Sequence, residues 1–398
     1  MKSPPKSASH GLFVKGSEAI LHVGAVACKT MCPFIRSSSM KAFNDCPRKF
    51  FLTDRLGIMP RRVTFSEATT IGNYCHAALS ALYTVNPASD EDVLDTISSA
   101  IADRMSEDLE RMSESLTKDA FLVGADPEKT GELLSRCADM ANAMIRIFWN
   151  RYPLGPDIEI LASEELLALE LVLPPLQGAG IPIAGQIDTI LKESSTGAIW
   201  PTDHKTSGDT AEDASVGRGW SYQTRLYRLL VAAKYGDPTG FIHNFIQRPT
   251  IKFCKKDADF DAYVTRCREW YAARKSDTYD QAMASYWLRH TEPLIPPELI
   301  RDLVNIYGAS TINVGSVSGS DFDAVFPRRE QSCRAWNSTC VYLPFCDQPK
   351  TDWPRLLDIK GSYTQEFPLH EGPVYSNAVD PVNQEPAQGD EHGHKEEE

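Results

Sequence analysis

The amino-acid sequence predicts an α/β protein in which a mixed central β-sheet is flanked by helices. Three observations predict this class. Amphipathic helical patterns fill the chain up to residue 151, and a run of strand-like patterns follows. Helix and strand patterns then alternate. Helices, a run of strands, and helix and strand again are the order expected when helices pack on a mixed sheet.

The composition is that of a soluble globular protein. The chain has 398 residues, 42% of them hydrophobic and 24% charged, which corresponds to two or three folding units or to one domain with long insertions. Apolar runs are shorter than a membrane span, and the first residues are a poor signal peptide. We therefore expect a cytoplasmic protein with no membrane partner. Its 10 cysteines are expected to be reduced, metal-bound or catalytic.

The net charge of −13 is unevenly distributed. Residues 376–398 hold seven acidic residues and one lysine, whereas residues 36–62 hold seven basic residues and two acidic ones. A polyanion binds to local basic patches and not to the net charge. The overall acidity therefore does not exclude a nucleic acid as partner.

An irregular N-terminal arm is predicted first, over residues 1–36, and helices follow it. Ser38 or Ser39 can cap a helix that ends near Gly57. Apolar residues at helical spacing predict the next helices. These helices span residues 66–83, 93–109 and 133–148.

Strand patterns begin after Pro153, with β-branched residues and leucine bounded by Pro and Gly. Strands are predicted at residues 158–162, 166–173, 181–191, 198–206 and 241–247. Helices are predicted at residues 216–235 and 260–290. Residues 355–398 are polar and acidic, which predicts disorder.

One predicted hairpin brings two acidic residues together. Its loop, residues 193–198, has the same midpoint as the pair Asp188 and Asp203. The two residues would face each other with Cβ atoms about 4.5–5.5 Å apart, where like charges oppose folding unless something neutralises them. A divalent cation such as Mg²⁺ would do so. Lys205, two residues beyond Asp203, lies on the same face of its strand.

Two carboxylates and an ammonium suit the hydrolysis of a phosphodiester bond. The metal would polarise the phosphate and activate water, and the lysine would position or deprotonate the nucleophile. A structural interpretation is also open, because a shift of the strand register by one residue would place the two carboxylates on opposite faces and leave Lys205 as a salt-bridge partner at a turn.

Three helical residues are further candidates for the site. His76 lies off the apolar stripe of its helix beside Gly72, and Gln223 and Tyr227 share one helix face. Each of these is also compatible with an ordinary helix.

Five short motifs occur in the order found in the RecB-like branch of the PD-(D/E)XK nuclease superfamily, which the sequence resembles. That branch includes CRISPR-associated and AddB-type nucleases with an iron-sulfur cluster. The motifs are Ser37-Ser38-Ser39 with Cys46-Pro47-Arg48-Lys49-Phe50, residues 72–76, residues 185–188, Asp203-His204-Lys205-Thr206, and residues 223–227.

The resemblance implies a restriction-endonuclease-like core that binds Mg²⁺ or Mn²⁺. Lys205 would be the catalytic lysine, and Gln223 with Tyr227 would hold the DNA strand and the site. The implied metal ligands are His76, Asp188, Asp203 and the backbone carbonyl of His204. The implied segments are residues 1–36 as the arm, 37–325 as the core, about 91–151 as a helical insertion, 326–350 as a cysteine clasp and 355–398 as the acidic tail.

The activity implied is that of an exonuclease in DNA recombination, repair or phage DNA processing, acting on single-stranded DNA or duplex ends. No G-x4-GK-[ST] phosphate loop is present, so unwinding would come from a separate helicase or recombination protein. The alternative is a non-catalytic iron-sulfur DNA-binding or adaptor subunit, against which the intact acidic pair and lysine argue. Some relatives carry a further acidic residue, which would be Glu164, Glu165 or Glu170.

Four cysteines resemble the [4Fe-4S] clasp of these nucleases. Three of them have the spacing C-x6-C-x5-C near the C-terminus, and the fourth precedes Pro47. Four thiolates are the usual ligands of such a cluster. Zinc, which more often uses C-x2-4-C pairs, unligated thiols, and ligation by Cys28 and Cys32 are the alternatives. The implied ligands are Cys46, Cys333, Cys340 and Cys346.

Basic residues flank these cysteines on both sides. Arg48 and Lys49 follow the first cysteine, and Arg328 and Arg329 precede the C-terminal three. We therefore expect the clasp to carry a basic surface for a phosphate backbone. An electron-transfer enzyme is disfavoured because the sequence has no recognisable flavin or nicotinamide site.

Overall fold

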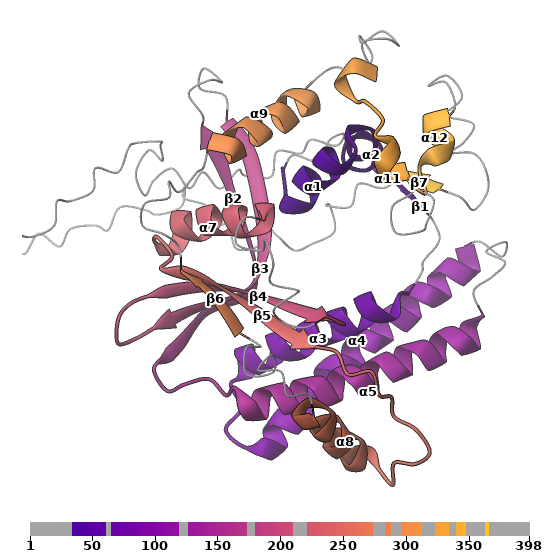
Figure 1. The fold of residues 1–398 in the computed structure, drawn as a ribbon, viewed down its shortest axis with the longest axis vertical. Helices are drawn as coiled ribbons and strands as arrows, with labels where there is room; N and C mark the ends of the chain where they lie inside the picture. The colour runs from indigo at the N-terminus through magenta and orange to yellow at the C-terminus, as the bar shows by residue number, and fades with distance from the viewer. Residues whose placement is uncertain are drawn as a thin grey trace, which may run out of the picture.

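A five-stranded mixed β-sheet separates two groups of helices in the computed structural model (Figure 1). The predicted α/β class, with a mixed sheet flanked by helices, is confirmed. Within the residues that the structure describes, no helix is both long enough and apolar enough to cross a membrane. The described residues are 34–60, 65–118, 126–172, 180–209, 221–273, 283–287, 297–311, 323–333, 340–347 and 363–365.

The strands of the sheet follow one another in chain order, β2-β3-β4-β5-β6. Only β4 and β5 are parallel, and the remaining neighbours are antiparallel. A parallel pair needs a crossover connection, and helix α7 (Tyr222–Tyr235) lies in that connection. The strands are β2 (Ile158–Val172), β3 (Gly180–Glu193), β4 (Ile199–Ser207), β5 (Gly240–Gln247) and β6 (Met283–Trp287).

The hairpin of β3 and β4 has the predicted register. Thr189 pairs with Thr202, so the next residues along the two strands are Asp188 and Asp203. Gly197 has φ +74° in the connecting turn, a backbone conformation that glycine adopts without the steric cost of a Cβ atom.

Strand β2 replaces the two separate strands predicted at residues 158–162 and 166–173. Its pairing with β3 shifts between Ile160 and Ala162, and Glu164 has φ +51°. A bulge and a left-handed residue interrupt the alternation of inward and outward side chains. The alternation of apolar and polar residues is therefore interrupted between residues 162 and 166, although the strand continues through them.

Helices α3, α4 and α5 cover one face of the sheet (Figure 1). Ser66 caps α3 by accepting a hydrogen bond from the Thr69 backbone N–H, and Asp126 caps α5 just before Pro127. The helices predicted at residues 93–109 and 133–148 are α4 and α5, which extend further at both ends. The bounds are α3 (Glu67–Val85), α4 (Asp90–Lys118), α5 (Pro127–Arg151) and α8 (Phe260–Ala273), which packs on α5.

Helices α7, α1 and α9 lie on the other face. The first helix is broken at Cys46, whose extended backbone (φ −162°) agrees with the restriction that a following proline imposes. Its N-cap is Arg36, not Ser38 or Ser39. These elements are α1 (Ser37–Asp45), α2 (Pro47–Phe50), the π-helical turn η1 (Phe51–Arg55) and α9 (Pro297–Thr311).

The helix predicted at residues 260–290 is confirmed over Phe260–Ala273 and wrong at Met283–Trp287, whereas residues 274–282 and 288–290 lie outside the described part. Met283–Trp287 form the edge strand β6, which pairs antiparallel with β5. Because this pairing satisfies the backbone through a partner distant in sequence, tertiary context overrides the local helical pattern.

Parts of the predicted arm and tail also pair with the core. Ile35 bridges to Ile183, donating its N–H to the Pro182 carbonyl (2.8 Å). Strand β7 (Tyr363–Gln365), within the segment predicted to be disordered, pairs with β1 (Ile58–Pro60). The prediction of disorder is therefore wrong for these three residues, and the rest of residues 355–398 lies outside the described part.

Candidate active site

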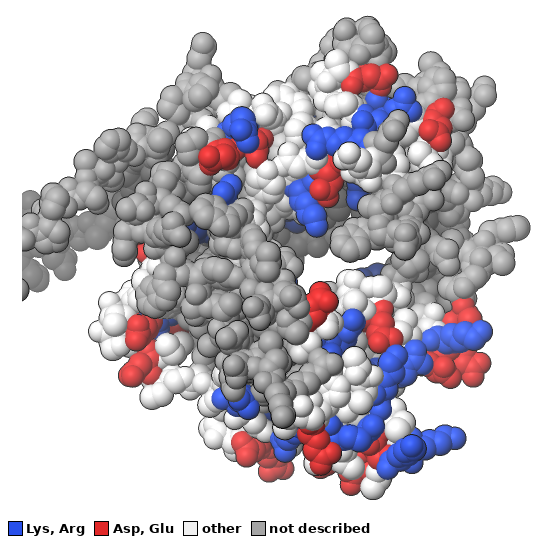
Figure 2. Space-filling view, in the orientation of Figure 1, with Lys and Arg blue, Asp and Glu red and all other residues white. Residues whose placement is uncertain are grey.

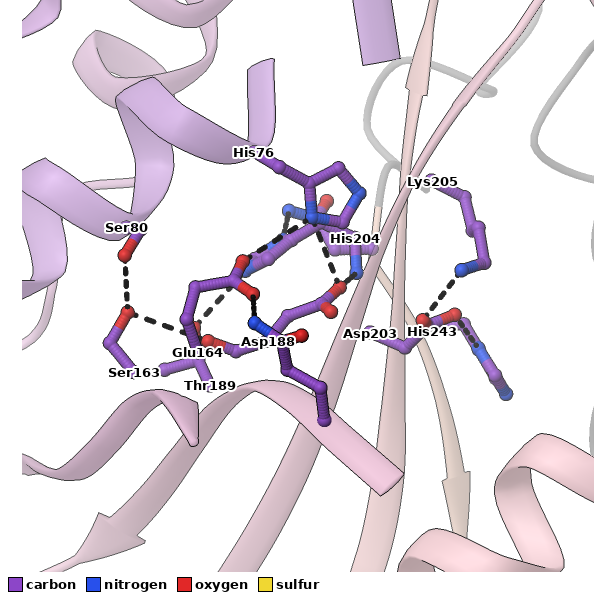
Figure 3. A network of polar contacts seen from close by, with 12 residues as sticks. His76, Ser80, Ser163, Glu164, Asp188, Thr189, Asp203, His204, Lys205 and His243 are labelled. Atoms are coloured by element: carbon purple, nitrogen blue, oxygen red, sulfur yellow. Dashed lines mark hydrogen bonds and ion pairs between the residues drawn. The ribbon is translucent and has the colours of Figure 1, made fainter. Parts of the chain in front are cut away.

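His76, Glu164 and Asp188 converge from three different elements (Figure 3). The Nδ1 atom of His76 on α3 lies 3.6 Å from Glu164 Oε1 on β2 and 3.5 Å from Asp188 Oδ2 on β3. Ligand atoms of all three lie within 4.8 Å of one another. Among the described residues, this is the group that could hold a metal ion.

Asp188 is a buried carboxylate at the centre of this group. Its Oδ2 accepts a hydrogen bond from the backbone N–H of His204 (2.7 Å). Burial raises the pKa of Asp188 to about 6; the nearby His76 lowers it and Asp203 raises it further. Burial alone would lower the pKa of His76, but its contacts with the carboxylates of Glu164 and Asp188 raise it. The carboxylates therefore favour a cationic neighbour.

Asp203 lies completely buried beside this group and is held by three donors. Lys205 Nζ approaches Oδ1 at 2.7 Å, Gln223 Nε2 approaches Oδ1 at 2.9 Å, and His243 Nδ1 approaches Oδ2 at 3.2 Å. Burial alone would raise the pKa of Asp203, but His243 and Lys205 outweigh it and lower the pKa. Asp203 is thus stabilised as a carboxylate. Lys205 lies on the same face of β4 as Asp203, as its spacing predicts.

The side chain of His204 is used for packing. It stacks on the ring of Tyr83 with 5.5 Å between centroids, and its Nδ1 lies 2.8 Å from Asn244 Nδ2. Burial, followed by repulsion from His76, lowers the pKa of His204 to about 3. The imidazole is therefore neutral, and the predicted role of this residue rests on its backbone carbonyl alone.

Two glycines bring helices close to the site. A Cβ atom on Gly185 would lie 2.7 Å from Cε1 of Tyr227, so the glycine lets the tyrosine of α7 pack directly on β3. A Cβ on Gly72 of α3 would meet Thr206 Oγ1 at 3.2 Å. The second contact agrees with the close approach expected beside His76.

The structure brings the predicted residues into two adjoining groups. The first group contains His76 and Asp188. The second contains Asp203, Lys205, Gln223 and Tyr227. In it, the Tyr227 hydroxyl accepts a hydrogen bond from Gln223 (3.2 Å). Asp203 forms no part of the three-residue group, so its predicted role as a metal ligand remains a prediction.

The three candidate glutamates differ in their contacts. Glu164 lies in the three-residue group with His76 and Asp188. Glu165 instead pairs with Lys234 and accepts a hydrogen bond from the Tyr235 hydroxyl (2.5 Å). Glu170 lies against Gly180 at the other end of β2.

Sequence reasoning missed the residues that support Asp203 and His204 from β5. His243 is fully buried between Asp203 and the Thr224 hydroxyl, which lies 3.1 Å from its Nε2. Asn244 holds His204. Two polar residues inside a strand of otherwise apolar residues, Phe241 to Ile246, are the signal that could have revealed them.

The four predicted cysteines also come together. Burial raises the pKa of Cys346 to about 11; the charge of Arg48 lowers it, and the neighbouring thiols of Cys46, Cys340 and Cys333 raise it. The Cys340 N–H donates to the Cys333 carbonyl (2.8 Å). The C-terminal three lie in or beside α11 (Glu330–Cys333) and α12 (Leu343–Asp347), whereas Cys28 and Cys32 lie outside the described residues.

The basic surface predicted at the clasp is present in part, because Arg48 is buried whereas Lys49, Arg328 and Arg329 are exposed. Arg48 is buried, forms an ion pair with Asp323 and donates to the Phe326 carbonyl (2.9 Å). Arg328 donates to the Cys346 carbonyl, and Arg329 donates to that of Asn44. These arginines tie the C-terminal segment to the N-terminal helices because each finds a protein acceptor. Lys49 and the two C-terminal arginines still present their charges to solvent.

Comparison with known proteins agrees with this geometry. The family model of the PD-(D/E)XK nuclease superfamily matches residues 37–305, more than half of the chain. The chain therefore belongs to the PD-(D/E)XK nuclease superfamily, whose members hydrolyse nucleic acids with divalent metal ions.

Among solved structures, the chain is similar to the crystal structure of "Putative exonuclease" from Eubacterium rectale. The two share 13% sequence identity with a TM-score of 0.30, and the match covers 64% of this chain and 84% of that one. No curated protein matches the chain.

Proposed function

We propose that the protein is a Mg²⁺- or Mn²⁺-dependent deoxyribonuclease of the RecB-like branch that acts as an exonuclease on single-stranded DNA or duplex ends. The observation that carries the proposal is the pair of adjoining groups, one of which offers a metal three ligands while the other holds Lys205 beside a buried carboxylate. A nuclease needs both a charge that polarises the phosphate and a group that handles the attacking water.

The residues present fit a hard divalent ion. Two carboxylates and one imidazole are ligands that Mn²⁺ and Mg²⁺ accept. The pKa of Asp188 is raised chiefly by burial and further by Asp203, so its negative charge is only partly compensated by the protein. His76, Glu164 and Asp188 would hold the ion, with Asp203 and the His204 carbonyl beside them. A bound ion would polarise the phosphate and lower the pKa of a water molecule.

Lys205 has the position required of the group that orients or deprotonates water. Its ammonium donates to Asp203, yet the side chain is partly exposed, so water and phosphate can reach it. Gln223 and His243 hold the Asp203 carboxylate from two sides, which fixes the direction of the lysine. This preorganisation places a positive charge where negative charge develops during hydrolysis.

We further propose that the four cysteines hold a [4Fe-4S] cluster. A single zinc ion with Zn–S bonds of about 2.3 Å would bring its thiolates to about 3.8 Å from one another. Within the described residues, no three of these sulfur atoms lie within 4.8 Å of one another, so they are not arranged as a closed zinc site. A cavity of about 680 Å³, lined by Cys333 and Cys346 among others, adjoins them.

The biological setting proposed is DNA recombination, repair or phage DNA processing. The chain carries no phosphate-loop motif, so a separate helicase or recombination protein would unwind a duplex substrate.

The test is incubation of anaerobically purified protein with end-labelled single-stranded and double-stranded DNA, in the presence of Mg²⁺, Mn²⁺ or EDTA. We expect metal-dependent release of nucleotides from an end, and none in EDTA. Internal cuts would make it an endonuclease, and cleavage of RNA in preference to DNA would change the substrate. DNA binding without cleavage under any metal would instead identify a non-catalytic adaptor subunit.

A further inference from the structure

The loop between β5 and α8 carries four basic residues. Its basic residues are Arg248, Lys252, Lys255 and Lys256, and the last three are exposed. In Figure 2, lysine and arginine side chains gather over the lower right of the face, where Figure 1 places this part of the chain. The loop was not part of any predicted motif.

This loop begins at the same edge of the sheet at which the strand of Lys205 ends, because β4 and β5 are parallel. The Arg248 N–H donates to the Ser207 carbonyl (2.7 Å), and the Arg248 guanidinium lies 3.3 Å from the position that a Cβ on Gly208 would take. Ser207 is two residues beyond Lys205, a rise of about 7 Å along a strand. A strand of nucleic acid that leaves Lys205 along β4 would therefore meet Arg248 first.

The loop is fixed in shape by Arg266 of α8. Its guanidinium binds both carboxylate oxygens of Asp257, at 2.8 Å each, and donates to the Lys252 carbonyl at 2.8 Å. The Asp257 carboxylate also accepts from the Cys254 N–H (2.9 Å). A segment that is already ordered loses little conformational entropy when it binds a ligand.

An exposed aromatic ring stands among these lysines. Phe253 is 39% exposed, although its ring contacts Phe260 and Tyr263 with centroids 5.9 Å and 5.6 Å apart. Lys255 and Lys256, two and three residues further on, have no ion-pair partner among the described residues. Bases that stack on aromatic rings and lysines that contact the backbone are the usual means of holding single-stranded nucleic acid.

We propose that residues 248–256 form a binding surface for a single-stranded stretch of the nucleic acid, with Arg248, Lys255 and Lys256 on phosphates and Phe253 stacked on a base. This surface extends the active site beyond Lys205, and the inference rests on the proposed function for its substrate. The inference predicts that the enzyme binds several nucleotides on one side of the scissile bond.

Binding in EDTA tests the surface without cleavage. The probe is fluorescein-labelled oligothymidylate, titrated with the full-length protein over a range of salt concentrations. In the double variant Lys255→Ala/Lys256→Ala, we expect the slope of log affinity against log salt to shrink by about 1.4, since each contact to single-stranded DNA contributes about 0.7. In Phe253→Leu, which keeps apolar volume but cannot stack, we expect about tenfold weaker binding with an unchanged slope.

The matched control is Lys192→Ala/Lys234→Ala, which removes the same charge from the far end of the hairpin and from the end of α7. We expect its slope to equal that of the wild type. Equal losses in the control and in the loop variant, or loop variants that bind like the wild type, would overturn the proposal. A loss seen only with blunt duplex DNA would also overturn it in favour of a duplex-binding surface.

The same variants separate this inference from the proposed nuclease. If the wild type cleaves the oligonucleotide with Mg²⁺ or Mn²⁺ while the loop variants bind and cleave identically, the nuclease stands and the surface is wrong. If the wild type fails to cleave DNA but the binding differences appear, the surface stands and the catalytic proposal is wrong.

Discussion

At Asp188, the burial of a carboxylate opposes its ionisation, and the site depends on this balance. This carboxylate is buried next to Glu164 and near Asp203, and among the described residues the His76 ring and the His204 backbone N–H contact it directly. Burying a charge without full compensation costs free energy. A bound cation relieves this cost, so the same arrangement that strains the metal-free protein selects a divalent ion.

The first prediction is that Asp188→Asn stabilises the metal-free protein. The pKa of Asp188 is raised from 3.8 to about 6, so the folded state disfavours the carboxylate. The stability of the metal-free wild type should therefore fall as pH rises from about 4 to about 6. The amide removes this loss, on the order of 1–3 kcal/mol at neutral pH.

Thermal unfolding in EDTA and in Mg²⁺ measures this effect. We expect the variant to melt higher than the wild type in EDTA, and added metal to stabilise only the wild type. A variant that is less stable than the wild type in EDTA at neutral pH would show that the carboxylate is fully compensated by protein groups.

The second prediction separates two adjacent glutamates. Glu164→Gln should weaken Mn²⁺ binding at least about tenfold, because one charged ligand is lost. Glu165→Gln is the matched control, since Glu165 contacts Lys234 and Tyr235 instead. Calorimetric titration with Mn²⁺ measures both, and equal affinities in the two variants would remove Glu164 from the metal site.

At the scale of elements, the hairpin of β3 and β4 could be predicted because its register follows from a short symmetric loop. The sequence did not reveal that β2 is one continuous strand. Its pattern is interrupted at Glu164, and the left-handed backbone there depends on pairing with β3. Strand β6 was missed for the same reason, since it pairs with β5. His243 was missed because only the parallel pairing of β4 and β5 places it beside Asp203.

The third prediction concerns how α7 packs on β3. Gly185→Ala would place a Cβ 2.7 Å from the Tyr227 ring, so we expect a loss of about 1–3 kcal/mol in the free energy of unfolding. Gly131→Ala on α5 is the control, because its Cβ would meet nothing within 4 Å and should stabilise the helix by about 0.5–1 kcal/mol. Urea unfolding compares them, and an unaltered Gly185→Ala midpoint would contradict the close packing.

For the whole molecule, the C-terminal segment is joined to the N-terminal helices across most of the chain. The Ser332 hydroxyl donates to the Asp45 carbonyl (2.5 Å), and the Tyr342 hydroxyl donates to the Ile58 carbonyl (3.1 Å). Cys46 and Cys346 add thiols to the same junction. A cluster bound there would stabilise only the folded state, because its ligands are far apart in the unfolded chain.

The fourth prediction is that anaerobically purified protein is brown, contains iron, and loses both colour and thermal stability in Cys346→Ser. Cys254→Ser, which changes an exposed thiol outside the junction, should keep both. Metal analysis, visible absorption and thermal unfolding measure the result. Zinc in place of iron would reject the iron-sulfur cluster while leaving a structural metal in the clasp.

The most direct test of the central claim is the cleavage rate of Lys205→Ala against that of the wild type, with Mn²⁺ affinity and DNA binding measured on the same preparations. We predict a loss of at least about a hundredfold in rate, with metal affinity and DNA binding retained, because Lys205 lies outside the three-residue metal group. Cleavage by Lys205→Ala at the wild-type rate would contradict the assignment of the active site.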